Sequence, residues 1–166
     1  MILDNLEVLF DHLDVDGPTN SQLEELYRLY LDDVCNIVFN DEILKVNTNK
    51  TRNPICKGKP QTFEHLITRK SKYSGKRCFD RDRANRIHWI KPIIENYKDA
   101  RIKHFTEYNH KNELQFFFLY EEKDFIIIIR ELSNGLMIVT AYYVDEGRKR
   151  GIRKKYFAYK EKNPTS

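Results

Sequence analysis

Four segments between residues 100 and 144 constrain the fold of this chain more than any other feature. These segments are residues 100–108, 113–122, 124–132 and 136–144. The first alternates between apolar and polar side chains, and the last three are rich in aromatic and β-branched side chains, which favour strands. The connections are short, with a tight turn around Lys123 and another at residues 133–135. Because such short connections force neighbouring strands to be antiparallel, the sequence predicts a four-stranded β-meander.

The third of these segments indicates which part of the sheet is buried. In FIIIIREL, within residues 124–132, apolar side chains occupy odd and even positions alike, and these positions face opposite sides of a strand. A half-buried strand would instead alternate between apolar and polar side chains. We therefore expect a central strand that is covered on both faces.

Apolar residues at helical spacing predict that helices precede the sheet. Residues 5–13 form one such segment, and a longer amphipathic helix of about five turns follows over residues 22–39. Ser21 is the expected N-cap, with Glu24 completing a capping box. The apolar stripe of this helix consists of Leu23, Leu26, Tyr30, Val34 and Ile37.

Shorter helical segments are predicted at residues 63–70 and 80–90, next to polar loops at residues 46–62 and 71–76. Pro92 is expected to kink or end the second of these helices.

A basic helix over residues 145–162, weakened by Gly151, closes the chain. The predicted fold class is α+β, with N-terminal helices followed by a four-stranded antiparallel β-meander and a basic C-terminal helix. In such a fold we expect the helices to pack on one face of the sheet and the opposite face to stay partly free.

Charge divides the chain into two parts. The net charge of +4 combines −9 in residues 1–45 with +13 in residues 46–166. We therefore expect an acidic helical N-terminal segment, 1–45, and a basic domain, 46–166. A basic block of this size suits a polyanion such as RNA, because each neutralised phosphate releases counterions. The alternative is a solvated basic surface on an ordinary protein.

Cysteine usage and the N-terminal sequence bear on the compartment. The cysteines Cys35, Cys56 and Cys78 are odd in number and lack the close pairs of a zinc site. A reducing, cytoplasmic setting fits them best. The N-terminus is acidic and lacks the features of a signal peptide, and no apolar stretch is long enough to span a membrane. We expect no membrane association.

The last predicted strand carries two candidate site residues. Strict alternation would place Thr140 and Tyr142 on one face together with Leu136, Ile138 and Val144. Their hydroxyl groups could hold a phosphate or donate a proton. The alternative is that threonine and tyrosine are simply good strand formers.

His65 is the main candidate for acid–base chemistry. It lies in TFEHLITRK, followed by Arg69 and Lys70, and a predicted helical face brings Thr68 beside it. Histidine titrates near neutral pH and acts as a general acid or base. A lone histidine is more often structural or solvated.

The segment RDRANRIHWI supplies further candidates. On the predicted helix Arg83 and Arg86 are three residues apart and face the same way, so that they could hold a phosphate together, with His88 nearby. The alternative is the charged outer face of an amphipathic helix. Trp89 is expected in the core. A further cationic set is expected to contact the RNA backbone: Arg69, Lys70, Arg148, Lys149, Arg150, Arg153 and Lys154.

Metal-dependent nuclease chemistry normally needs several acidic ligands, and the basic region offers only scattered ones. No P-loop, zinc-protease or serine-hydrolase motif is present. Cleavage without a metal or another cofactor is therefore the simpler expectation. It favours RNA, whose own 2′-hydroxyl can attack the phosphate.

With these pieces in this order, residues 54–160 resemble the phage barnase–EndoU–colicin–RelE-like (BECR-fold) nucleases. The resemblance depends on TFEHLITRK, RANRIHWIKPIIEN, FFFLYEEKDFIIIIREL, MIVTAYYV and the basic terminal helix. It implies a ribonuclease of toxin or phage-defence type in residues 46–166. The positions that match its motifs are His65, Arg83, Arg86, His88, Thr140 and Tyr142. A barnase-like catalytic glutamate is missing from the sheet, and Glu131 at a strand end is the nearest candidate.

The resulting hypothesis is an endoribonuclease that cleaves by transesterification. His65 serves as base or acid, Arg83 and Arg86 stabilise the transition state, and Thr140 and Tyr142 orient the phosphate or donate a proton. The alternatives are a non-catalytic RNA-binding module and a toxin that binds a partner protein. A cognate antitoxin or immunity protein would then be a partner. The N-terminal helices could cover the RNA site, mediate a homodimer or simply support the fold.

Overall fold

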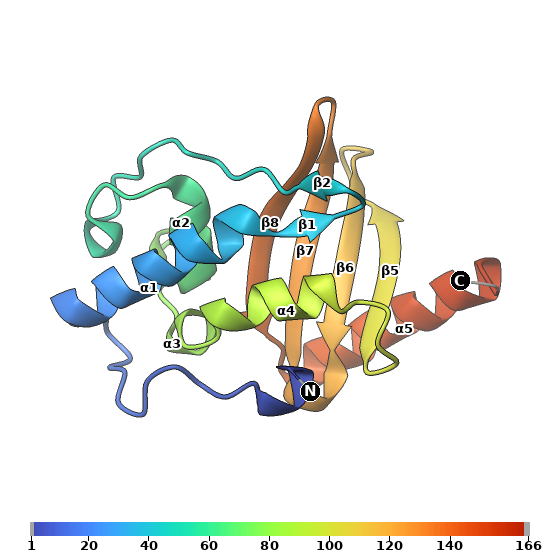
Figure 1. Ribbon diagram of the computed structural model, residues 1–166, viewed down its shortest axis with the longest axis horizontal. Helices are drawn as coiled ribbons and strands as arrows, with labels where there is room; N and C mark the ends of the chain where they lie inside the picture. Colours follow the sequence, from blue (N-terminus) through green and yellow to red (C-terminus); the bar gives the residue numbers. More distant parts are fainter. Residues whose placement is uncertain (1, 165–166) are drawn as a thin grey trace.

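The computed structural model describes residues 2–164 and confirms the predicted α+β architecture. The chain forms a four-stranded antiparallel sheet in the order β5-β6-β7-β8, with helices before it and a long helix after it (Figure 1). The strands are β5 (Ile102–Tyr108), β6 (Leu114–Tyr120), β7 (Phe125–Leu132) and β8 (Gly135–Tyr143). Their short connections include the single turn η5 (Glu121–Lys123). The expected β-meander is therefore present.

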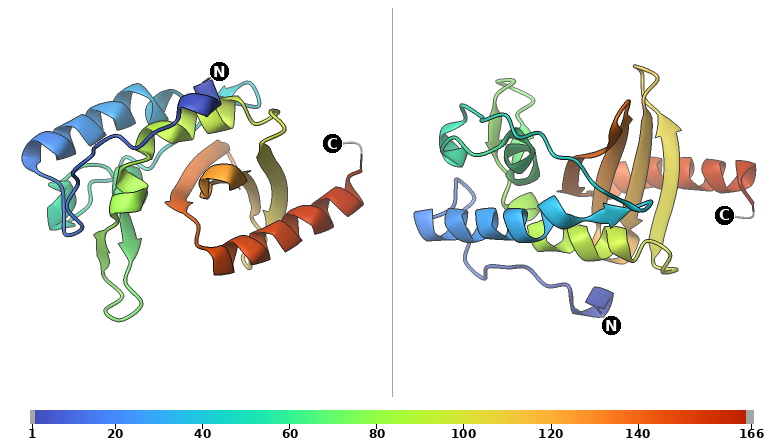
Figure 2. Two further views of the ribbon diagram at one scale, coloured as in Figure 1. Left: turned by 90° about the horizontal axis from the view of Figure 1, so that it is seen from below. Right: turned by 45° about the horizontal axis from the view of Figure 1, so that its top comes forward.

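Strand β7 is buried on both faces, as its unbroken apolar sequence predicts. Ile126 and Ile127 are adjacent in sequence and both are fully buried, but they belong to different hydrophobic clusters. Ile127 faces the main core beneath the N-terminal helices. Ile126 faces a smaller cluster beneath the C-terminal helix, where Tyr156 packs. The sheet thus has a helical layer on each side, as the left view of Figure 2 shows.

The C-terminal helix α5 (Glu146–Lys162) makes the second face of the sheet less open than expected. It begins after the N-cap Asp145, whose carboxylate accepts a hydrogen bond from the Arg148 amide. The inward-facing side chains of α5 pack on the smaller cluster: Ile152, Tyr156 and Tyr159. The expectation of a partly free face is therefore wrong for the part of the sheet that α5 crosses.

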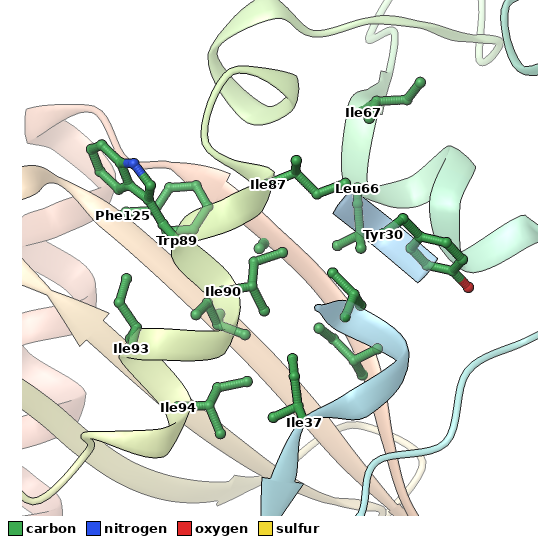
Figure 3. Close-up of a cluster of buried hydrophobic side chains, with 14 of the residues drawn as sticks. Tyr30, Ile37, Leu66, Ile67, Ile87, Trp89, Ile90, Ile93, Ile94 and Phe125 are labelled. Carbon is green, nitrogen blue, oxygen red and sulfur yellow. The ribbon is translucent and has the colours of Figure 1, made fainter. Parts of the chain in front are cut away.

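The main N-terminal helix α1 (Asn20–Asp32) is shorter than predicted. The single turn η2 (Val34–Asn36) and the strand β1 (Val38–Phe39) continue the segment, and β1 pairs with β2 (Glu42–Ile43). The N-cap is Thr19 rather than Ser21, with Gln22 in place of Glu24 as the partner in the capping box. The predicted stripe is nevertheless correct, because all its members are buried: Leu23, Leu26, Tyr30, Val34 and Ile37. Figure 3 shows Tyr30 and Ile37 in the core.

Residues 5–13 do not form the predicted helix. Only η1 (Ile2–Asn5) is helical there, and an irregular chain follows it. The backbone groups of this chain bind side chains elsewhere in the fold instead of one another. Asn85 binds both the amide and the carbonyl group of Phe10, and the Trp89 indole donates to the carbonyl of Glu7. Tertiary hydrogen bonds have replaced the helical ones here.

The acidic segment and the basic remainder share one hydrophobic core. Leu3, Leu26 and Val34 belong to the same buried cluster as Trp89 and Phe125. Removing residues 1–45 would therefore expose a large apolar surface. No helix among residues 2–164 is long and apolar enough to cross a membrane.

The predicted helix over residues 80–90 is broken in two. It comprises α3 (Arg81–Ala84) and η4 (Ile87–Trp89), which leads directly into α4 (Ile90–Glu95). Pro92 neither kinks nor ends a helix, because it lies in the first turn of α4, where its missing N–H is not needed. Asn85 is the C-cap of α3 at this break, and its side chain holds the N-terminal segment.

The predicted helix over residues 63–70 ends early. Helix α2 (Gln61–Ile67) stops where Thr68 adopts an extended conformation, and the chain continues as β3 (Thr68–Lys70), paired with β4 (Arg77–Phe79). The preceding loop contains the single turn η3 (Pro54–Cys56). Arg69 and Lys70 therefore lie on a hairpin instead of a helix. Thr68 is not on a helical face with His65.

Strand β8 contains a β-bulge that changes which residues share a face. Thr140 pairs with Ile128, but Ile138 pairs with Ile129, so that Val139 is an extra residue. An extra residue shifts the alternation of side chains from that point on. The prediction that Thr140 and Tyr142 share a face with Leu136 and Ile138 is therefore wrong. Leu136 and Ile138 face the main core, whereas Thr140 and Tyr142 turn toward the opposite side.

Candidate functional site: a basic cleft at the edge of the sheet

A cleft of about 660 Å³ lies where the edge strand β8 meets α2, the β3–β4 hairpin and the start of α5. Side chains that are distant in sequence meet there, including His65, Arg83, Thr140 and Tyr142. Six lysine and arginine side chains line the cleft, against two aspartates. The surplus of positive charge makes the cleft suitable for an anionic ligand.

Arg83 connects the two sides of the cleft. Its Nη1 atom donates to the carbonyl oxygens of His65 at 3.1 Å and Thr68 at 2.9 Å, and to the Thr140 hydroxyl at 3.2 Å. Its Nε atom lies 3.4 Å from the carboxylate of Asp80. The end of α2, the hairpin and strand β8 are therefore held together by one guanidinium group.

Arg77 places a second guanidinium beside the first. Its Nε donates to the Thr68 hydroxyl and its Nη2 to the Thr68 carbonyl, both at 2.9 Å. Burial is the largest effect that lowers the pKa of Arg77 and of Arg83 below the usual arginine value. Both side chains remain cations at neutral pH. Two desolvated positive charges thus lie close together, which favours binding of an anion between or beside them.

His65 occupies the last turn of α2 and is partly exposed to the cleft. Burial lowers its pKa, and the positive charge of Arg77 lowers it further, while the nearby carboxylate of Glu64 raises it. The Nε2 atom lies 3.8 Å from Oε1 of Glu64, and the other oxygen of that carboxylate accepts a hydrogen bond from Thr51 at 2.6 Å. The net effect keeps the imidazole neutral at neutral pH. A neutral imidazole can accept a proton.

Tyr142 lies between two arginines. The guanidinium of Arg83 is 5.3 Å from the centre of its ring, and that of Arg148 is 5.8 Å away. The Tyr142 hydroxyl has no hydrogen-bond partner among residues 2–164. This hydroxyl is therefore available to a ligand.

Two of the predicted catalytic residues lie outside the cleft. The break after α3 turns Arg86 onto the rings of Trp89 and Tyr143, at 5.2 and 5.0 Å from their centres. His88 Nε2 lies 2.7 Å from the carbonyl oxygen of Glu7. Arg83 and Arg86 therefore do not form the expected pair on one helical face. Glu131, at the end of β7, lines a different hollow.

The predicted RNA-contacting cations divide into two groups. Arg69, Lys70 and Arg148 line the cleft. The others lie further along α5 and do not line it: Lys149, Arg150, Arg153 and Lys154. Lys149 is held by Asp124 at 2.6 Å and Arg153 by Glu121 at 3.0 Å, so that these two stabilise the packing of α5.

Arg77, Asp80, Lys72 and Tyr73 also line the cleft, although the sequence analysis did not identify them. Arg77 reaches the site because β4 pairs with β3, which places it opposite Lys70. Ser74-Gly75 is a turn signal that could have predicted this hairpin. The predicted helix over residues 63–70 left no place for it, because that helix includes the residues of β3.

A larger hollow of about 840 Å³ lies between the β1–β2 turn and the end of α4. Its charged lining is mainly acidic, with Asp41, Glu95 and Asp99 against Lys98. It contains none of the candidate site residues. Size alone therefore does not identify the site, and the basic cleft is the better candidate for an anionic ligand.

Within the described part of the chain, no group of three or more His, Cys, Asp or Glu side chains could hold a metal ion. Comparisons with protein-family models, with curated proteins and with solved structures found no match for this chain.

Proposed function

We propose that this protein is a metal-independent endoribonuclease that cleaves RNA by transesterification in the basic cleft. One observation carries the proposal. A histidine held neutral, the partly buried cations Arg77 and Arg83, and the free hydroxyl of Tyr142 all meet in one cleft. A base, an anion site and a proton donor are what this reaction requires.

Arg83 and Arg77 would bind the scissile phosphate. The Nη2 atom of Arg83 and the Nη1 atom of Arg77 donate to no atom among residues 2–164. The other nitrogens of both groups contact fixed protein atoms, so that the free ones are held in place before substrate arrives. Donors fixed in this way stabilise the charge that develops on the phosphate oxygens in the transition state.

His65 would act as the general base. It would take the proton of the 2′-hydroxyl while the 2′-oxygen attacks phosphorus and the bond from phosphorus to the 5′-oxygen breaks. Tyr142 would give its proton to the leaving 5′-oxygen. The products are a 2′,3′-cyclic phosphate and a 5′-hydroxyl end, with no net consumption of water in this step.

The cations on the rim would hold the neighbouring phosphates. Arg69, Lys70 and Arg148 line the cleft and carry no sequence information by themselves. Arg150 and Lys154 are exposed on the adjoining helix and could extend the same positive surface. These residues would contribute affinity in a salt-dependent manner.

The test is cleavage of a fluorescently labelled RNA by the purified full-length protein in the presence of EDTA. We expect cleavage that His65→Ala reduces by about 10²- to 10⁴-fold. RNA with 2′-O-methyl groups should bind without being cut. His110→Ala is the matched control, because His110 is exposed in the turn between β5 and β6 and does not line the cleft.

Three results would contradict the proposal. Cleavage that EDTA abolishes would contradict a metal-independent mechanism. Cleavage by His65→Ala at the wild-type rate would remove the assigned base. Tight RNA binding without any cleavage would replace the nuclease with a non-catalytic RNA-binding module.

A further inference from the structure

The loop between β3 and β4 is held in one shape by its own hydrogen bonds. The hydroxyl of Ser71 accepts from the amides of Tyr73 at 3.2 Å and Ser74 at 3.4 Å. The amide of Gly75 donates to the Ser71 carbonyl, and Gly75 itself has a φ of 69°, which a glycine adopts without strain. The hairpin therefore presents its tip in a defined orientation.

Tyr73 is fully exposed at the tip of this hairpin. Its relative exposure is 100%, and it makes no ring contact with any other residue in the part of the chain that the structure describes. An aromatic ring that stays in water buries no apolar area, so that the stability of the fold does not explain its position. The green hairpin projects from the body of the protein in the left view of Figure 2.

The surroundings of Tyr73 indicate what could cover its ring. Tyr73 lines the same cleft as His65, together with Lys70 and Lys72. Both lysines are exposed. An aromatic face beside solvated cations matches a nucleotide, whose base stacks on the ring while its phosphate binds the cations.

We infer that Tyr73 forms a base-stacking subsite, and that the substrate is RNA that is unpaired at the nucleotide beside the scissile phosphate. The bases of a duplex are already stacked on their neighbours, so that only an unpaired base has a face free for the ring. This inference rests on the proposed function of the cleft. It adds a substrate class, single-stranded RNA or an unpaired loop, which that function leaves open.

The test measures binding of uncleavable RNA to the full-length protein by fluorescence anisotropy. The probes are a 2′-O-methyl oligonucleotide and the duplex that it forms with its complement. We expect Tyr73→Ala to weaken single-strand binding by roughly 10-fold and to leave duplex binding unchanged. Tyr73→Phe should retain the wild-type affinity, because stacking needs the ring and not the hydroxyl.

Tyr108→Ala is the matched control. Tyr108 is another exposed tyrosine, at 63% relative exposure, but it lies at the end of β5 and does not line the cleft. Its removal should leave RNA binding unchanged. A second readout places 2-aminopurine in the single strand, where stacking on an aromatic ring quenches its fluorescence. The quenching should be present with Tyr73→Phe and absent with Tyr73→Ala.

The outcomes separate the two proposals. If wild-type protein binds and cuts RNA and Tyr73→Ala binds the single strand equally well, only the stacking inference is overturned. Equal weakening of single-strand and duplex binding, or a Tyr73→Phe variant as weak as Tyr73→Ala, would also overturn it alone. If the wild-type protein binds no RNA at all, the proposed function and the inference both fail.

Discussion

Arg83→Ala is the substitution whose effect the structure defines most clearly. One nitrogen of Arg83 donates to the carbonyl oxygens of His65 and Thr68 and to the hydroxyl of Thr140, and another lies 3.4 Å from Asp80. The side chain is only 13% exposed. Removing it takes a charged donor from three acceptors at once and leaves Asp80 without its nearest cation.

The size of the effect follows from how deeply the partners are buried. Removing one member of a fully buried ion pair is destabilising by about 3–5 kcal/mol. Asp80 is 15% exposed and keeps a second cation, Arg69, at 3.9 Å, so that part of its charge stays compensated. We therefore expect Arg83→Ala to lower the free energy of unfolding by about 2–3 kcal/mol.

Urea unfolding followed by tryptophan fluorescence measures this quantity, because Trp89 is the single tryptophan and is buried. Arg69→Ala is the matched control. It removes a cation from the same carboxylate, but its side chain is 57% exposed. A surface pair of this kind contributes at most about 1 kcal/mol. An Arg83→Ala variant as stable as Arg69→Ala would refute the structural role assigned to Arg83.

Three further predictions concern stability and can be checked by the same method. The free energy of unfolding should decrease as pH falls from neutral through about 6.5. Burial lowers the pKa of three histidines in the folded protein, so that the unfolded chain takes up protons on them more readily than the folded one: His65, His88 and His104. A flat profile between pH 7 and about 5 would contradict this. Asn85→Ala should be destabilising by about 1–3 kcal/mol, since a buried side chain loses both of its bonds to Phe10, and hydrogen exchange at the Phe10 amide should accelerate. Unchanged exchange would contradict that role. Asp145→Ala should remove about 1 kcal/mol through loss of the α5 N-cap, whereas Asp145→Asn, which can still cap, should restore most of it.

The sheet could be predicted from sequence because short, neighbouring segments of the chain determine it. Each strand combines a β-favouring composition with a short connection to the next, and such connections leave only one arrangement of neighbours. The predicted bounds of the last strand, 136–144, differ by one residue at each end from those of β8. The buried residues of α1 were predictable for the same reason, since the spacing of Leu23, Leu26 and Tyr30 follows the period of the helix itself.

The helical segments around the site were predicted less well because distant contacts determine them. Nothing in the sequence near Asn85 shows that its side chain will bind the backbone of Phe10, 75 residues away. Asn85 is also the C-cap of α3, and the break at this point lies between Arg83 and Arg86. The pattern of apolar residues at Ile87 and Ile90 continues across the break, so that periodicity predicted one helix where the chain has two.

The position of Thr140 and Tyr142 shows how one residue can decide where a site lies. With strict alternation both side chains would face the main core with Leu136 and Ile138, which would bury their hydroxyls. The extra residue Val139 reverses the alternation, so that Ala141 enters the main core in their place. Ala141 has no polar group to satisfy, and Thr140 reaches Arg83 instead. The bulge therefore removes two polar side chains from the core and delivers them to the cleft at once, which links the stability of the sheet to the composition of the site.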